Sequence, residues 1–193
     1  RSTVMILPIA YYGNPVLREK GAQVESVTPE ITQLIEGMFE TMEDRRGIGL
    51  AAHQVGMAIQ LTVIDIRSVE DRPSTLELGG EEADPHSIMP IVLINPTITP
   101  LNDPEKGPEG CLSFPEIFGD ISRPDKVRVK ALDRQGEPFE FVCSGLLARC
   151  VQHETDHLHG ILFIDRMDRE TKADLREDLT VLQEKTKATL AEQ

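Results

Sequence analysis

Long hydrophobic runs and tryptophan are both absent from this chain of 193 residues. No apolar run approaches the ~18 residues that a membrane-spanning helix needs. The apolar stretch at residues 5–10 is too short for the core of a secretory signal peptide. The sequence therefore predicts a soluble protein without a membrane span, located in the bacterial cytoplasm, or in an organelle if a targeting segment has been removed.

Cysteines and basic residues are also scarce. Three cysteines are an odd number and do not suit a disulfide framework. They fit a reducing compartment, where a thiolate can bind a metal. The chain has 20 basic against 33 acidic residues, a formal charge of −13. Such a protein repels phosphates, so we expect no nucleic-acid-binding groove, although a local basic patch remains compatible with this charge.

Length and composition favour a single domain over residues 1–193. A hydrophobic content of 39% at this length supports one proper core. Residues 67–90 are polar and contain a Gly-Gly pair and three prolines, which predicts a mobile loop between strands. Residues 169–193 are highly charged with sparse leucines, which predicts a C-terminal helix on the surface or on a partner.

What the chain does contain is a His-Glu-x-x-His motif at His153, Glu154 and His157. Positions four apart share one face of a helix, so both imidazoles can bind one metal ion. Glu154 is then close to a water on that metal and can accept its proton. Apolar spacing around the motif predicts a helix over 145–159, with Ser144 as its N-cap.

The motif leaves the third metal ligand undetermined, and a catalytic centre usually has three. By residue type the candidates are Glu170, Glu177, His159, Cys111, Cys143 and Cys150. The offset of His159 turns it away from the other two histidines. Cys143 and Cys150 fall in apolar patterns typical of a core. Cys111 lies in a glycine-bearing loop, from which a thiolate could point into a site.

The remaining pattern predicts an α+β fold, with antiparallel sheets around the central metal-binding helix. Thr28-Pro29-Glu30 is typical of a helix start, and Gly47 of its end. Alternating or apolar runs predict strands over 60–66, over 91–95 ending at Pro96, and over 127–133 and 138–143 as a hairpin, with turns over 104–108.

A glycine-rich stretch at residues 47–56 follows the first predicted helix. It lacks the third glycine of a dinucleotide-binding fingerprint, and no strand precedes it. Gln54 is the residue here whose side chain can donate a hydrogen bond to an oxyanion. His53 is a ligand by type, but lone histidines are mostly structural or exposed, so we leave it out of the site.

Three stretches together resemble the three signature motifs of peptide deformylase, in order and at compatible separations. They are GIGLAAHQ at 47–54, EGCLS at 109–113 and QHETDH at 152–157. The resemblance extends to GNPVLR at 13–18 and GILFID at 160–165. It covers most of the chain and is far more specific than the histidine motif alone.

The resemblance implies a metal site and a reaction. The implied metal ligands are Cys111, His153 and His157; Glu154 is the general acid and base, and Gln54 and the N–H of Leu112 are the oxyanion donors. The reaction is removal of the N-formyl group from the initiator methionine of new polypeptides, with release of formate. The implied metal is Fe²⁺, and Zn²⁺ often occupies the site in preparations.

The resemblance also implies a substrate site and a structural ion pair. The main chain of Ile48 and Gly49 holds the peptide, and Leu146, Cys150 and His153 line the methionine pocket. Glu109 pairs with Arg123. The chain departs from the family at His53, where proline is frequent, and at Phe118, where some bacterial members carry arginine beside the second substrate residue.

The expected partners are N-formyl-methionyl peptides and, through the C-terminal helix, the ribosome near its exit tunnel. Two alternatives remain open at this point. One is a zinc protease with a distant glutamate as third ligand, in which Cys111 is dispensable. The other is a non-enzymatic binding protein with a structural metal, in which Glu154 has no role.

Overall fold

The computed structural model describes residues 5–193, so the first four residues of the expected domain lie outside the described part. The larger sheet has seven antiparallel strands in the spatial order β1-β2-β5-β8-β9-β3-β4. Their bounds are β1 Gly49–Ala51, β2 Leu61–Ile64, β3 Ser74–Leu78, β4 Glu81–Ala83, β5 Ile91–Pro100, β8 Lys126–Leu132 and β9 Pro138–Gly145. A second sheet contains β6 (Pro104–Cys111) and β7 (Phe114–Pro124).

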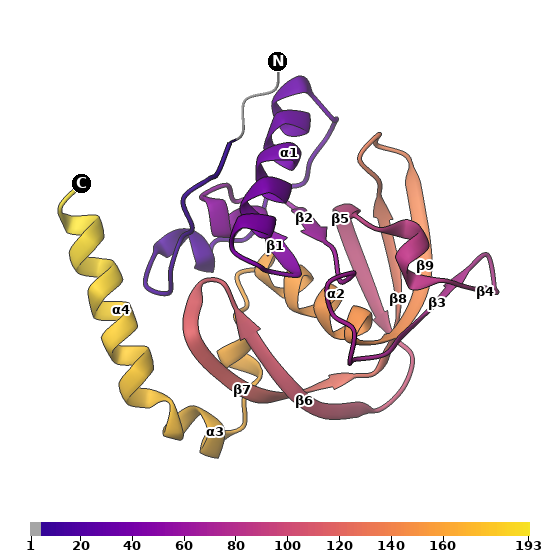
Figure 1. Ribbon diagram of the computed structural model, residues 1–193. Helices are drawn as coiled ribbons and strands as arrows, with labels where there is room; N and C mark the ends of the chain where they lie inside the picture. Colours follow the sequence, from indigo (N-terminus) through magenta and orange to yellow (C-terminus); the bar gives the residue numbers. More distant parts are fainter. Residues whose placement is uncertain (1–4) are drawn as a thin grey trace.

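Four α-helices and four short 3-10 helices complete the described fold. The α-helices are α1 Pro29–Asp44, α2 Leu146–His157, α3 Arg169–Asp174 and α4 Arg176–Ala191. The 3-10 helices are η1 Pro15–Arg18, η2 Ala52–Val55, η3 Pro85–Ile88 and η4 Phe163–Arg166. Figure 1 shows α2 in the middle of the molecule, with the larger sheet on one side and the β6–β7 hairpin on the other. This arrangement confirms the predicted α+β class with antiparallel sheets around a central helix.

Helices α1 and α2 cover opposite faces of the same strands. In β5, Ile91 and Leu93 pack in the cluster that contains α2, whereas Val92 and Ile94 pack in the cluster that contains α1. Successive side chains of a strand point to opposite faces, so both sides of β5 are buried here. The unbroken apolar run at 91–94 follows from this packing, which also places α2 in the interior.

The N-terminus of α2 is held by a distant strand. The predicted Ser144 cap is wrong, because Gly145 is the N-cap and provides no side-chain hydrogen bond. Instead, the N–H of Leu147 donates to the hydroxyl of Ser74 at 2.9 Å, from β3. A capping partner 73 residues away cannot be predicted from local sequence patterns. The predicted extent of the helix agrees with the observed Leu146–His157 within a few residues.

Half of the region expected as a mobile loop is regular structure, in β3, β4 and η3. Strands β3 and β4 form a hairpin, and β3 also pairs with β9, where Leu76 is opposite Cys143. Gly79 and Gly80 connect the two strands with φ of 59° and 82°. Two positive φ values in a two-residue connection are typical of a tight hairpin turn. The expectation of an irregular loop over 67–90 was therefore wrong, because the Gly-Gly pair forms a turn between strands, whereas its mobility stays a prediction.

Two further predictions, of a strand end and of turns, were wrong. Strand β5 does not end at Pro96 but continues to Pro100, with a register shift after Ile94 and Asn95 at φ 52°. Residues 104–108 belong to β6, not to turns. Proline is tolerated at bulges and in outer strands because no ladder donor is lost there. Both errors came from reading proline as a terminator.

The other predicted elements are confirmed, with one change at the C-terminus. Helix α1 begins after Thr28, whose hydroxyl accepts a hydrogen bond from the N–H of Ile31. The hairpin of β8 and β9 forms as expected. The C-terminal region contains two helices separated at Leu175, and Leu179 of α4 is buried in a third core cluster with Leu17.

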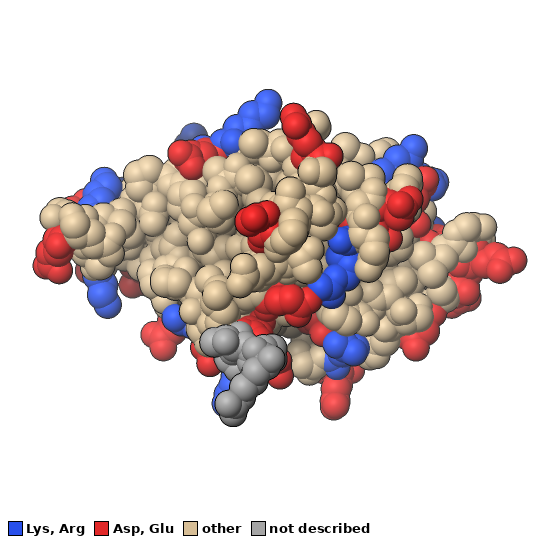
Figure 2. All heavy atoms as spheres, turned by 90° about the horizontal axis from the view of Figure 1, so that it is seen from above, with Lys and Arg blue, Asp and Glu red and all other residues tan. Residues whose placement is uncertain are grey.

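The charged surface is mixed. Figure 2 shows Lys and Arg interspersed with Asp and Glu on the face seen from above, and the described residues form no broad basic surface on that face. Among residues 5–193, no helix is both long enough and apolar enough to cross a membrane.

Candidate metal centre

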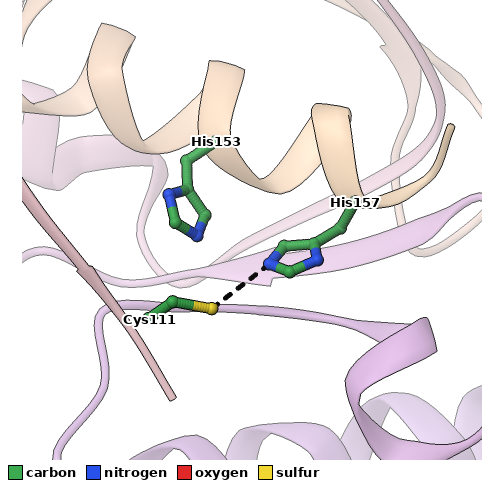
Figure 3. A group of neighbouring side chains, drawn as sticks. All are labelled: Cys111, His153 and His157. Carbon is green, nitrogen blue, oxygen red and sulfur yellow. Dashed lines mark hydrogen bonds between the residues drawn. The ribbon is translucent and has the colours of Figure 1, made fainter. Parts of the chain in front are cut away.

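Three side chains from two parts of the fold converge on one point (Figure 3). Cys111 lies at the end of β6, and His153 and His157 lie one turn apart on α2. One ligand atom from each lies within 4.8 Å of the others. Cys111 Sγ is 3.5 Å from His157 Nε2. A tetrahedral metal with bonds of about 2.3 Å to sulfur and about 2.0 Å to nitrogen separates those atoms by about 3.5 Å, so the spacing fits a metal.

The electrostatics of the cluster also suit a cation. Burial, with the neighbouring His153, lowers the pKa of His157 well below its ordinary value. Burial acts in the same direction on His153, but Cys111 and Glu109 outweigh it and raise the pKa of His153 well above the ordinary value. The Cys111 sulfur and the Glu109 carboxylate thus favour positive charge on the ring between them. A divalent ion such as Fe²⁺ or Zn²⁺ provides this charge, and thiolate with imidazole suits both.

Glu109 connects the cluster to a buried set of cations. Its carboxylate accepts hydrogen bonds from His153 Nδ1 at 2.9 Å, Arg123 Nε at 2.6 Å and Arg149 Nη1 at 2.9 Å. Burial alone would raise the pKa of Glu109, but the hydrogen bonds from His153 and Arg123 hold it at about 2. Because Nδ1 of His153 is engaged, its Nε2 is left for the cluster. The pair of Glu109 with Arg123 is therefore present, and Glu109 fixes the orientation of the His153 ring.

Glu154 is a buried carboxylate beside the cluster. It is 4% exposed, and its Oε1 has no hydrogen-bond partner among the described residues. Burial raises the pKa of Glu154 to about 7, although the nearby His153 opposes the shift. Its other oxygen packs against Gly49, where a Cβ would lie 2.5 Å from Oε2. The glycine-rich stretch therefore leaves room for this carboxylate, which is suited to accept and return a proton.

Gln54 and Leu112 adjoin Cys111 from two directions. Gln54 is 1% exposed, and its Nε2 lies 3.5 Å from Cys111 Sγ and 3.1 Å from the Ser113 hydroxyl. Its Oε1 accepts from the N–H of Ala51, so the amide nitrogen is the end that points toward the cluster. Leu112 follows Cys111 in the turn of the hairpin, and its N–H donates to no described residue. Both groups are hydrogen-bond donors beside the cluster.

A cleft of about 570 Å³ opens over these groups. Its lining includes Ile48, Gly49, Leu146 and Cys150, together with His153 and Glu154. Leu146 and Cys150 are buried one turn apart on α2, which gives the floor an apolar part. Strand β1 is at the edge of the larger sheet and pairs only with β2 among the described strands. Its other edge is available to an extended peptide.

Several residues considered from the sequence lie outside the cluster. His53 is buried, with Nε2 2.9 Å from the Glu19 carbonyl oxygen, and His159 is exposed. Glu170 and Glu177 are exposed on α3 and α4, and neither joins a metal-binding group of the described residues. Cys143 is fully buried in the core. Of the open candidates for a third ligand, the structure brings only Cys111 to the two histidines.

Three supporting residues were missed in the sequence. Ser113 holds Gln54, Arg149 holds Glu109, and Asp156 accepts from Arg123 at 2.9 Å. Arg149 could have been found, because it precedes His153 by four residues and so shares its helix face. Ser113 and Asp156 depend on contacts between distant segments, which spacing does not reveal.

The converging Cys and His side chains and the buried carboxylate beneath an open cleft suit a metal-dependent hydrolase. The chain belongs to the polypeptide deformylase family, which matches residues 6–173. It is 45% identical over 186 residues to a peptide deformylase of Opitutus terrae, covering 95% of this chain and 96% of that protein. The chain is accordingly a hydrolase of this family, as the resemblance implied.

Solved structures of the family agree with this assignment. A crystal structure of a peptide deformylase from Legionella pneumophila has a TM-score of 0.76 and 38% identity, covering 97% of this chain and 99% of that one. The Arabidopsis thaliana enzyme, crystallised with an inhibitor, has a TM-score of 0.80 and 36% identity, covering 95% and 93%.

Proposed function

We propose that this hydrolase removes the formyl group from the initiator methionine of new polypeptides and releases formate. The observation that carries the proposal is Glu154, a buried carboxylate with an unpartnered oxygen, beside the ligand atoms of Cys111, His153 and His157. An unpaired buried carboxylate costs stability, so its retention at an open cleft points to a chemical role.

Cys111, His153 and His157 would hold a divalent metal, with Fe²⁺ as the proposed ion and Zn²⁺ as the alternative in preparations. When bound, the metal supplies Lewis acidity, which polarises a carbonyl and lowers the pKa of water. Glu109 keeps His153 in the tautomer whose Nε2 faces the cluster, through the 2.9 Å contact with Nδ1.

The cleft explains how a formylated peptide would bind. The main chain of Ile48 and Gly49 lies at the free edge of the larger sheet and can pair with the peptide backbone. The methionine side chain would then enter the apolar part of the floor, against Leu146 and Cys150. This places the formyl group over the buried polar groups and the rest of the peptide toward solvent.

The reaction then needs one group that carries a proton and two fixed hydrogen-bond donors. Glu154 takes a proton from water as the oxygen attacks the formyl carbon, and passes it to the amine nitrogen as the C–N bond breaks. Gln54 Nε2 and the N–H of Leu112 donate to the carbonyl oxygen, where negative charge develops. One such donor is worth about 3–4 kcal/mol in the transition state. The products are formate and a peptide with a free amino terminus.

The test is formate release from formyl-Met-Ala-Ser by protein loaded with Fe²⁺ without oxygen. We expect turnover by the wild type, and loss of turnover in Glu154→Gln with bound iron unchanged. Cys111→Ser should lose both iron and turnover. Glu184→Gln, on the exposed side of α4, is the matched control and should retain both.

The same experiment separates the two alternatives. A zinc protease would cleave unformylated peptides internally and would keep its metal in Cys111→Ser. A structural metal site would leave the protein unaffected by Glu154→Gln and release no formate. Absence of formate from folded, iron-loaded wild type would remove the proposed function.

A further inference from the structure

The mouth of the cleft is basic, although the protein carries a formal charge of −13. Four charged side chains line the cleft and are exposed or half-exposed: Arg45, Arg46, Arg72 and Glu116. Arg149 also lines it, but Glu109 and main-chain carbonyls engage its guanidinium. Three free or weakly engaged cations thus face one carboxylate at the opening. Overall composition does not account for this local excess of positive charge.

Arg46 and Arg72 have no acidic partner. Among the described residues, no carboxylate lies within 4.0 Å of either guanidinium. Arg45 has one contact of 3.8 Å with the adjacent Asp44, and it donates to the Tyr11 hydroxyl at 3.1 Å. A peptide carboxylate arriving at the mouth would therefore compete with no existing ion pair of Arg46 or Arg72.

The backbone of Arg46 gives independent support. Arg46 follows Arg45, the C-cap of α1, and has φ of 56°, a conformation that favours glycine. The turn is closed by hydrogen bonds from Arg46 N to Glu43 O and from Gly47 N to Met42 O, at 3.1 and 2.9 Å. Helix termination alone would be served better by glycine, so the fold does not explain an arginine here. Strained positions of this kind occur frequently at functional sites.

We infer that Arg46 and Arg72 make the enzyme select formylated peptides with acidic side chains at the second and third residues. The inference rests on the proposed function and names the substrate class of the same site. A peptide extended along β1 advances about 3.3 Å per residue, so these side chains leave the buried floor and reach the mouth. Guanidinium binds carboxylate through two parallel hydrogen bonds. A basic side chain at the same place would be repelled.

The test compares three peptide amides as substrates of the metal-loaded protein: formyl-Met-Asp-Asp, formyl-Met-Ser-Ser and formyl-Met-Lys-Lys. A pair of opposite charges about 4 Å apart in water changes an equilibrium about fivefold. We therefore expect kcat/KM for the Asp peptide to exceed that for the Lys peptide about tenfold or more at low salt. The difference should appear mainly in KM and shrink at about 1 M salt, where screening acts within about 3 Å.

Charge-reversal variants test whether Arg46 and Arg72 cause the preference for acidic peptides. Arg46→Glu with Arg72→Glu should invert the order of the Asp and Lys peptides. Lys187→Glu, an exposed site on α4 with the same change in charge, should leave the order unchanged. Arg46→Gly removes the charge while suiting the positive φ, so it should reduce the preference without loss of stability. This variant keeps the test valid if charge reversal disturbs folding.

The outcomes separate the two proposals. Equal kcat/KM for the Asp and Lys peptides, or an order unchanged by reversal of both arginines, would overturn the inference while the deformylase proposal stands. No formate from any of the three peptides would remove the proposed function itself, and with it this inference.

Discussion

Helices α2 and α4 differ in what surrounds them. Ten of the 12 residues of α2 are buried, among them Gln152, His153, Glu154, Thr155 and His157. Of the 16 residues of α4, Leu179 and Thr186 are buried. Figure 1 shows α2 enclosed by the sheets and α4 along the outside of the molecule. Both helices contain many polar residues, but those of α2 are largely buried and those of α4 are largely exposed.

The contrast between buried and hydrated polar groups indicates that α2, and not α4, carries the functional side chains. Polar groups removed from water cost free energy unless they are paired or bind a ligand. On α4 the charged side chains remain hydrated, so no ligand is needed to explain them. On α2, Oε1 of the Glu154 carboxylate has no partner among the described residues. The proposed metal centre and the proposed role of Glu154 would explain why such a helix is kept in the core.

Removing one member of the buried ion pair near α2 should have the largest effect on stability. Arg123 is 4% exposed and contacts Glu109 at 2.6 Å and Asp156 at 2.9 Å. Arg123→Met removes a buried charge and leaves Glu109 with Arg149 and His153 alone, so we expect a loss of about 3 kcal/mol in the free energy of unfolding, the lower end for a broken buried pair. Urea denaturation measures this. Arg128→Met, which removes a half-exposed pair at 3.4 Å, should cost at most about 1 kcal/mol. Equal losses would contradict the contrast between interior and surface.

A methyl group added beside Glu154 should impair catalysis. A Cβ at Gly49 would lie 2.5 Å from Glu154 Oε2 and 2.9 Å from its carboxyl carbon. Because the carboxylate is buried, Gly49→Ala must displace it, and misplacement by about 1 Å can cost about 10²-fold. We expect kcat for formate release to fall by about that factor. Gly37→Ala on α1, where the neighbour is the end of the Leu7 side chain, should leave kcat unchanged.

The one buried leucine of α4 should matter less. Leu179 is 7% exposed and packs in the cluster with Leu17 and Phe163. Leu179→Ala should reduce the free energy of unfolding by about 2 kcal/mol, the lower end for such truncations, because the helix lies at the edge. Urea denaturation with unchanged kcat is the expected result. No change in stability would mean that α4 does not contribute to the core in solution.

The smallest effect is expected on the outer face of α4. Val181 is 63% exposed. Val181→Asp should change the free energy of unfolding by less than about 0.5 kcal/mol, as for most surface substitutions. A loss comparable to that of Leu179→Ala would show that this face is covered, for example by a partner.

The parts of the fold that the sequence predicted are those governed by local rules. Helix α1 has its cap and stripe within one segment, and β8 with β9 forms a short-range hairpin. The cap of α2 was wrongly assigned to Ser144, because Ser74 on another strand accepts the hydrogen bond from the N–H of Leu147. Residues 104–108 were misjudged because proline disturbs a strand only where a ladder hydrogen bond is lost.

The site residues also divide into those that local spacing predicts and those that depend on tertiary contacts. Spacing on one helix paired His153 with His157. Cys111 stayed one of several open candidates until the resemblance selected it, because a separate hairpin brings it to the histidines. The contacts of Arg149 and Asp156 depend on tertiary packing. The basic mouth could not be predicted, because Arg46 and Arg72 come from segments that become neighbours of the cleft only in the folded chain.

The central claim is that Cys111, His153 and His157 bind one metal. X-ray absorption at the iron edge of the Fe²⁺-loaded protein tests it most directly. We predict one sulfur and two imidazole nitrogens among the nearest atoms, with the sulfur lost in whatever metal Cys111→Ser retains. A wild-type spectrum without sulfur, in which carboxylate oxygen completes the two nitrogens, would contradict the account.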